Sequence, residues 1–144
     1  MAETTTTIKI SRGAFQHVEA ELYAYQDTIK EIARLREEIL HASPEPNRTG
    51  GGRSNTPSDS TGLAATRLAT NKRLNTLTEV AEAIKGVYDS LTPDKQKLVR
   101  LRYWTKPQLL TWDGVAMELH VSRRQALRWR DEIVLAIALK LGWR

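Results

Sequence analysis

The stretch from residue 111 to 131, TWDGVAMELHVSRRQALRWRD, constrains the fold of this chain more than any other. Its apolar residues recur three and four positions apart on both sides of a short break, which predicts two helices joined by a tight turn. Ala116 is small enough for the second helix to cross over it, and His120 stands at the corner, where glycine is more usual. The side chains expected to face inward are Val115, Ala116, Leu119, Val121, Ala126 and Trp129. The pattern is that of a helix-turn-helix.

Capping residues indicate where these two helices begin. Thr111 can accept a hydrogen bond from a free N–H of the first turn, and Asp113 lies near the positive end of that helix. Ser122, with Gln125 three residues later, has the capping-box pattern, so the second helix is expected to begin at Arg123. The pattern leaves open whether Ser122 and Gln125 are occupied in capping or are free to touch DNA bases.

The amino-terminal half of the second helix is expected to expose a basic face. This face consists of Ser122, Arg123, Arg124, Leu127 and Arg128, and we add Thr111 and Gln125 as candidate contacts. The major groove of duplex DNA admits a helix, and arginine matches the paired acceptors on a guanine edge. These residues are therefore candidate DNA-binding residues. The alternative is a solvated basic face on a small helical bundle.

The distribution of charge favours the same partner. The chain carries a net charge of +5, but residues 1–61 have seven Lys/Arg against nine Asp/Glu, a net −2, and residues 62–144 have fifteen against eight, a net +7. Basic charge is thus collected on the half that holds the helix-turn-helix, as a polyphosphate partner requires. A membrane surface is disfavoured because the basic residues do not follow one amphipathic stripe.

Composition argues against several other classes of protein. The chain has no cysteine, which excludes disulfides and thiolate metal sites. Its three histidines are scattered without metal-ligand spacing, so we expect neither an enzyme nor a bound cofactor. No apolar run approaches the ~20 residues that cross a membrane, and the amino terminus lacks a hydrophobic signal core. We therefore expect a protein of the cytoplasm.

Residues 1–41 are predicted to form a helical oligomerisation segment. After a threonine-rich arm over residues 1–10, Ser11 can cap a long helix that ends near His41. Its apolar positions repeat like one seam of a coiled coil, with Arg36 at a seam position. They are Phe15, Val18, Leu22, Tyr25, Ile29, Ile32 and Ile39. A second copy can cover this seam, which we favour and which implies a homodimer; the alternative cover is the chain's own next helix.

Residues 42–61 are predicted to be a flexible linker, because Pro, Gly, Ser and Thr dominate and no large apolar residue occurs there. The run Gly50–Ser54 lacks the lysine and the spacing of a phosphate-binding loop, so we do not expect a bound nucleotide. A second long helix is expected from residues 59–61 to Ser90. The inward positions of this helix are Leu74, Leu77, Val80 or Ala81, Ile84, Val87 and Leu91. Residues 62–144 are assigned to the DNA-binding domain, with the helix-turn-helix at 111–141.

Two further helical segments complete a predicted all-α fold. One begins at Pro93 after a Thr92 cap. Its buried face is expected to contain Leu98, Val99, Leu101 and either Tyr103 or Trp104. The helix that starts at Arg123 continues to Leu141, and its part from Ile133 onward is apolar nearly all round. We expect that part to be buried against Leu98 and Leu101 or against another copy, and Gly142 to end it in the left-handed conformation.

The run from Leu91 through Leu141 resembles region 4 of bacterial sigma factors, in which a helix ending in L-x-L-R-[YF] precedes the helix-turn-helix. The ending here is Leu98-Val99-Arg100-Leu101-Arg102-Tyr103, and V-S-R at Val121–Arg123 also agrees. A longer resemblance, over residues 12–141, is to the RinA-type phage transcriptional activators. They share an amino-terminal helix, a glycine-rich stretch running into an N-T dipeptide (here Gly50–Gly52 and Asn55-Thr56), a middle helix and the carboxyl-terminal unit.

This resemblance implies an activator of late phage genes that binds double-stranded promoter DNA in the host bacterial cytoplasm. It also implies that Ser122, Arg123, Arg124, Leu127 and Arg128 face the DNA groove. Two other functions stay open at this point. A packaging component such as a small terminase subunit would assemble as a ring of roughly eight or more copies, and a sigma-like unit could dock on host RNA polymerase.

Overall fold

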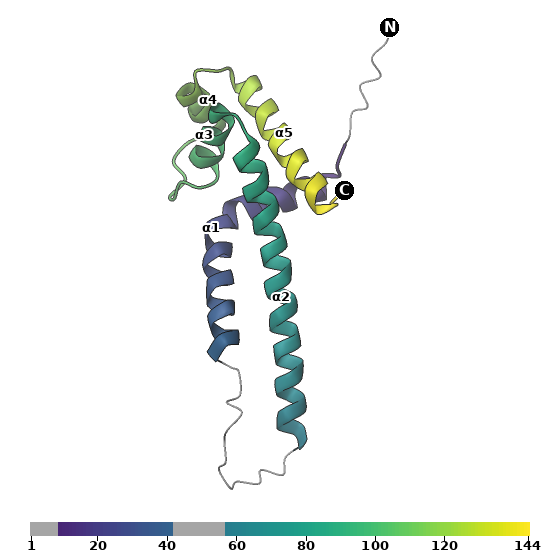
Figure 1. Ribbon diagram of the computed structural model, residues 1–144. Coiled ribbons are helices and arrows are strands. Elements are labelled where there is room, and N and C mark those ends of the chain that lie inside the picture. Colours follow the sequence, from purple (N-terminus) through teal and green to yellow (C-terminus); the bar gives the residue numbers. More distant parts are fainter. Residues whose placement is uncertain (1–8, 42–56) are drawn as a thin grey trace.

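The computed structural model describes residues 9–41 and 57–144, which form five α-helices (Figure 1). These are α1 (Arg12–His41), α2 (Pro57–Ser90), α3 (Pro93–Arg102), α4 (Trp112–Leu119) and α5 (Arg123–Leu141). No strand occurs within the two described ranges, and the predicted all-α class is confirmed. Because α2 starts at Pro57, residues 57–61 of the predicted linker are helical. The rest of that linker, with Gly50–Ser54, lies outside the described residues, as do residues 1–8 of the predicted arm.

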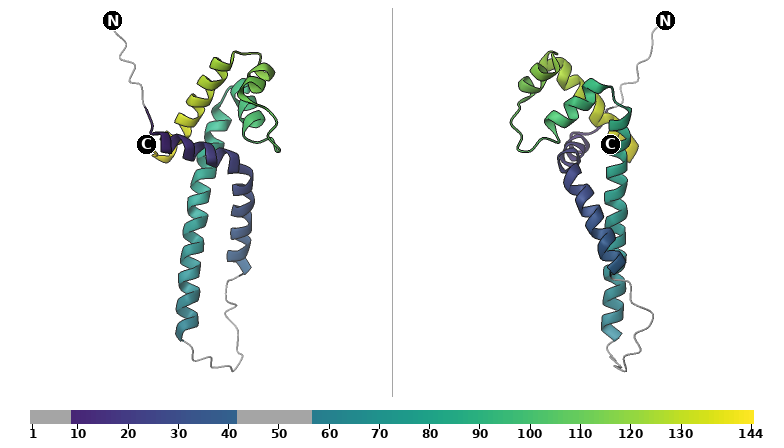
Figure 2. Two further views of the ribbon diagram at one scale, coloured as in Figure 1. Left: turned by 180° about the vertical axis from the view of Figure 1, so that it is seen from behind. Right: turned by 60° about the vertical axis from the view of Figure 1, so that its left-hand side comes forward.

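The second half of α1 lies beside α2 and runs in the opposite direction, so that the two form a long helical hairpin (Figures 1 and 2). The short helices α3 and α4 pack near the end of α2, and α5 returns from there along α2 to the beginning of α1. Helix α5 contacts each of the other four helices. It is therefore the element on which the packing of the bundle converges.

One hydrophobic core joins all five helices. Its members include Tyr103, which follows α3, and four side chains from the second half of α5. Fully buried core side chains, one from each helix, are Leu22, Ile84, Leu98, Val115 and Val134. The segment predicted for oligomerisation and the segment predicted for DNA binding thus share a single core.

Helix α1 buries the predicted seam in its first half and a different face in its second half. Thr28 and Leu35 are buried, whereas Ile29 is 45% exposed and Arg36 is exposed, so the seam predicted through positions 29 and 36 is wrong. The reason is that α1 changes direction along its length (Figures 1 and 2). The indole N–H of Trp104 donates a hydrogen bond to the carbonyl of Leu22 (3.2 Å), and an outside donor in the helical ladder is a known cause of bending.

The α1 seam is covered within the chain. Val18 and Leu22 are buried in the shared core, and Ile32 is buried in the half of α1 that runs beside α2. Of the two alternatives that the sequence left open, the structure contains the intramolecular one. A second copy is not needed to bury these residues, and the homodimer stays a prediction.

Helix α2 is buried only toward its carboxyl end. Val80 and Ala81 are both buried, together with Ile84 and Val87, while the side chains of residues 62–69 are exposed. This agrees with the predicted inward face, which begins at Leu74. Across the described ranges, no helix combines the length and the apolar character that crossing a membrane requires.

Two details of the carboxyl-terminal half differ from the predictions. Thr92 stands at the N-cap of α3 with an extended backbone, but its side chain accepts no capping hydrogen bond; Thr92 is exposed, so water can reach the free N–H groups. The second half of α5 is not buried all round, because Leu139 is 49% exposed. One face of α5, with Ile133, Val134 and Ile137, packs mainly toward α1 and α2, and the opposite face is left to solvent.

Polar and aromatic contacts tie α1 to the carboxyl-terminal helices. The Tyr103 hydroxyl donates a hydrogen bond to Oε2 of Glu19 (2.7 Å), and the ring of His17 stacks on Trp143 with 3.9 Å between centroids. Ser11 caps α1, as predicted, by accepting a hydrogen bond from the Ala14 N–H. The first half of α1 is thus held by directional contacts as well as by apolar burial.

Tyr103 gives a test of this junction. Burial of the ring, with the negative charge of Glu19 beside it, raises the pKa of Tyr103 well above 10.0. The unfolded chain therefore ionises this phenol near pH 10 while the native chain does not, so its contribution to stability is full below pH 10 and is lost as the pH rises further. We expect Tyr103→Phe to reduce the steepness of this alkaline loss by up to about 1.4 kcal/mol per pH unit.

The measurement is urea unfolding between about pH 9 and 11. Tyr23→Phe is the matched control, since Tyr23 lies on α1 against Tyr103 but is 36% exposed. Equal pH slopes for the parent chain and Tyr103→Phe would contradict the prediction.

Candidate functional site

Helix α4 is built as the sequence predicts. The Thr111 side chain caps it by accepting a hydrogen bond from the Gly114 N–H (3.2 Å). Val115, Ala116 and Leu119 are buried, and α5 packs against this face. The candidate residue Thr111 is therefore an exposed helix cap at the start of α4.

The turn after α4 has the predicted left-handed corner. His120 has φ 56° and ψ 39°, a conformation that histidine adopts more readily than most residues other than glycine. The His120 N–H donates to the Met117 carbonyl (3.2 Å), and the Val121 N–H donates to the Ala116 carbonyl (3.0 Å). Both bonds satisfy carbonyls at the end of α4, so the turn fixes where α5 starts.

Helix α5 begins at Arg123, as predicted. The Ser122 hydroxyl oxygen accepts a hydrogen bond from the Gln125 N–H (3.0 Å) at this N-cap. The open question about Ser122 is answered in part, because its oxygen is occupied in capping. The Gln125 side chain is half-buried and makes no hydrogen bond with the described residues.

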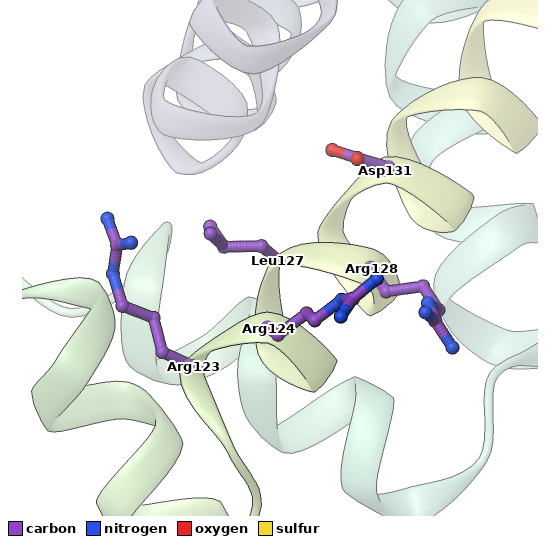
Figure 3. A pocket seen from close by; sticks show the side chains of 5 residues that line it. All are labelled: Arg123, Arg124, Leu127, Arg128 and Asp131. Carbon is purple, nitrogen blue, oxygen red and sulfur yellow. The ribbon is translucent and has the colours of Figure 1, made fainter.

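The exposed side of the first two turns of α5 lines an open groove of about 570 Å³. Its lining residues are Arg123, Arg124, Leu127, Arg128 and Asp131. In Figure 3 Leu127 extends toward the side of Arg123, and Arg124 and Arg128 extend to the other side. Four of the seven predicted site residues thus come together in one place, and Asp131 joins them.

The three groove arginines are not equivalent. Nε of Arg123 lies 3.4 Å from Oδ1 of Asp113 on α4, in an ion pair that is exposed on both sides and therefore weak. Arg124 and Arg128 are also exposed, but neither forms a hydrogen bond or ion pair with any residue that the structure describes. Two guanidinium groups are therefore available to a ligand without breaking an internal contact.

Arg130, which the sequence did not single out, has a different role from its neighbours. Its guanidinium lies over the rings of Phe15 on α1 (5.1 Å) and Trp112 on α4 (5.4 Å), and it pairs with Asp131 (2.8 Å). It thus joins α5 to α1 and α4. No local pattern in the sequence indicates this role, because both ring contacts are made with residues of other helices.

Chemically, the groove offers three arginine cations around the alkyl side chain of Leu127, and its carboxylate, Asp131, is paired with Arg130. Within the described residues no group of three or more His, Cys, Asp or Glu side chains is placed to hold a metal ion. The groove can bind a ligand that presents anionic groups or hydrogen-bond acceptors, since arginine side chains carry donors only.

Comparison with known proteins identifies the family. A family model described as "Protein of unknown function (DUF722)" matches residues 22–138. The chain belongs to this family. No curated protein and no solved structure matches the chain. The match extends from Leu22 on α1 to Ala138 on α5, and so includes the groove.

The α5 cap gives a prediction for stability. Ser122→Ala removes the acceptor for the Gln125 N–H, and we expect the free energy of unfolding to fall by about 1 kcal/mol. Urea unfolding of the two proteins measures the difference.

Ser122→Asp is the matched control, because aspartate keeps an acceptor and adds a favourable negative charge at the positive end of the helix. The aspartate variant should be as stable as the parent. If Ser122→Ala were equally stable, the cap would have no role in fixing the start of α5.

Proposed function

We propose that this chain is a sequence-specific regulator of transcription that binds double-stranded DNA and inserts the amino-terminal half of α5 into the major groove. The observation that carries the proposal is the pair Arg124 and Arg128. Both guanidinium groups are exposed on one side of α5 and without a partner among the described residues. Arginine can donate two parallel hydrogen bonds to the edge of a guanine, which is the commonest specific contact to a base.

The arrangement of α4, the turn and α5 supports this function. As a helix-turn-helix, α4 would cross the DNA backbone while the first turns of α5 contact base edges. The second half of α5 is anchored in the core through Ile133, Val134 and Ile137. An anchored helix presents its exposed end without a large loss of conformational entropy on binding.

Charge supports duplex DNA over an acidic protein partner. The carboxyl-terminal 83 residues, 62–144, carry the net +7 noted above, against −2 for residues 1–61. A ligand with regularly spaced phosphates uses such charge by displacing counterions, so affinity for DNA should fall steeply with salt.

The biological role in the proposal depends on the resemblance to the RinA-type activators. On this resemblance, we propose that the chain regulates the late genes of a phage, with promoter DNA in the host cytoplasm as the target and host RNA polymerase as a further partner. A homodimer would place two α5 helices about 34 Å apart on a two-fold DNA site. The description of the matched family assigns no function, so the groove and the resemblance are what support this proposal.

Arg124→Ala tests the assignment of the groove. We expect it to weaken binding to the cognate promoter fragment by about 1–3 kcal/mol, because a bidentate contact to a base is lost. Affinity is measured by fluorescence anisotropy at fixed salt, with the free energy of unfolding checked in parallel.

Arg36→Ala is the matched control. It removes an exposed arginine from the half of α1 that runs beside α2, away from the start of α5 (Figure 1). It should leave specific binding nearly unchanged. Equal effects of the two substitutions would mean that only total charge matters and that α5 does not read the bases.

Asp113 provides a second test, in the opposite direction. Its carboxylate pairs with Arg123 and would repel a nearby phosphate, so Asp113→Asn should tighten DNA binding by about three- to tenfold and steepen the salt dependence by about one unit. Glu118→Gln, at the other end of α4, removes the same charge without releasing a groove arginine and should change binding less. The proposed docking face would be wrong if Glu118→Gln had the larger effect.

A further inference from the structure

Among the residues that the structure describes, Leu127 is the one apolar side chain that lines the groove at the start of α5. It is half-buried, yet it is neither a member of the hydrophobic core nor one of the partly buried side chains that pack on the core. In Figure 3 Leu127 extends toward the Arg123 side of the groove, whereas the side chains of Arg124 and Arg128 extend to the opposite side. Packing inside the protein therefore does not account for a leucine at this position.

The neighbours of Leu127 limit what it can contact. Arg123 lies four residues before it and Arg124 three residues before it, and residues three or four apart on a helix have Cβ atoms about 5–6 Å apart. An alkyl group and a guanidinium at this spacing can reach neighbouring base pairs, which are stacked about 3.4 Å apart. In the major groove the apolar feature of a base is the C5-methyl group of thymine, whereas guanine offers two acceptors to arginine.

We propose that Leu127 is a specificity-determining residue that contacts the C5-methyl group of a pyrimidine, beside a guanine that Arg124 contacts. This inference rests on the proposed function, since it requires α5 to lie in the major groove. The group recognised is the methyl itself, so 5-methylcytosine satisfies the contact as well as thymine does. It follows that methylation of a cytosine at this position strengthens binding.

The size of the effect follows from the area buried. Seating one methyl group against an alkyl side chain changes the dissociation constant by about fourfold. That is smaller than the loss of an arginine–guanine contact, which reaches tenfold or more in order-of-magnitude terms. The methyl contact therefore tunes the choice of sequence, and the arginines provide most of the affinity.

The experiment starts from a random pool of DNA duplexes of about 20 base pairs, two helical turns, from which the full chain selects a preferred sequence. Each thymine of that duplex is replaced in turn by deoxyuridine, which removes only the methyl group. At the position where this replacement weakens binding most, a duplex with cytosine opposite guanine is then compared with a duplex that has 5-methylcytosine opposite guanine. We expect the parent chain to prefer thymine over deoxyuridine, and 5-methylcytosine over cytosine, each by about fourfold.

Variants connect this preference to the side chain. Leu127→Ala should bind the methylated and unmethylated members of each pair equally, and Leu127→Met, which keeps an apolar chain, should retain the preference. Leu139→Ala is the matched control, because Leu139 is a half-exposed leucine on the same helix outside the groove. Arg124→Ala should weaken all four duplexes and keep the ratio within each pair.

The inference is overturned if the parent chain prefers no methylated position, or if Leu127→Ala keeps the preference. It is also overturned if Leu127→Ala loses binding to a protein such as RNA polymerase while its methyl preference is unchanged. A pool that shows no enrichment and no binding means that the proposed function fails, and the inference fails with it. Binding without a preferred sequence preserves the DNA partner but excludes the role of Leu127.

Discussion

The packing of the second half of α5 is the interaction on which the rest of the structure depends. Ile133, Val134, Ile137 and Ala138 are buried where α5 meets α1 and α2. Their burial fixes the direction of the helix, and the same rigid rod then carries Arg124 and Arg128 out to solvent at its other end. Because a helix of 19 residues is continuous from Arg123 to Leu141, the core and the groove are two ends of one element. The cationic groove is positioned by apolar contacts made about one to four turns away.

The first half of α1 completes this support. Its residues contact Tyr103 and Trp104, which follow α3, Arg130 on α5 and Trp143 just after α5. The predicted separation into an oligomerisation segment and a DNA-binding domain therefore does not correspond to two separate cores. The remainder of α1 forms a hairpin with α2. This hairpin extends away from the start of α5 (Figures 1 and 2).

Local signals in the sequence predicted most of the helices and the framework of the site, and long-range contacts could not be predicted. Thr111, Ser122 and Gly142 act through hydrogen bonds and backbone angles within a few residues, so their positions predicted the ends of α4 and α5. The face of α1 that is buried depends instead on a bend associated with Trp104, which is distant in sequence, and the periodicity placed Ile29 inside although it is exposed. Arg130 was missed for the same reason, since its ring contacts come from other helices. The binding of DNA in the groove stays a proposal.

The sharing of α1 between hairpin and bundle has a mechanical consequence. The Arg130 guanidinium of α5 lies over the ring of Phe15 on α1, and Glu19 on α1 accepts a hydrogen bond from the buried Tyr103 phenol after α3. Tilting the amino-terminal part of α1 would therefore break one contact with α5 and one with the end of α3. The hairpin is a long rod attached to that same part (Figure 1). The orientation of the hairpin and that of the groove-bearing helix are thus coupled through the rings on which Arg130 rests.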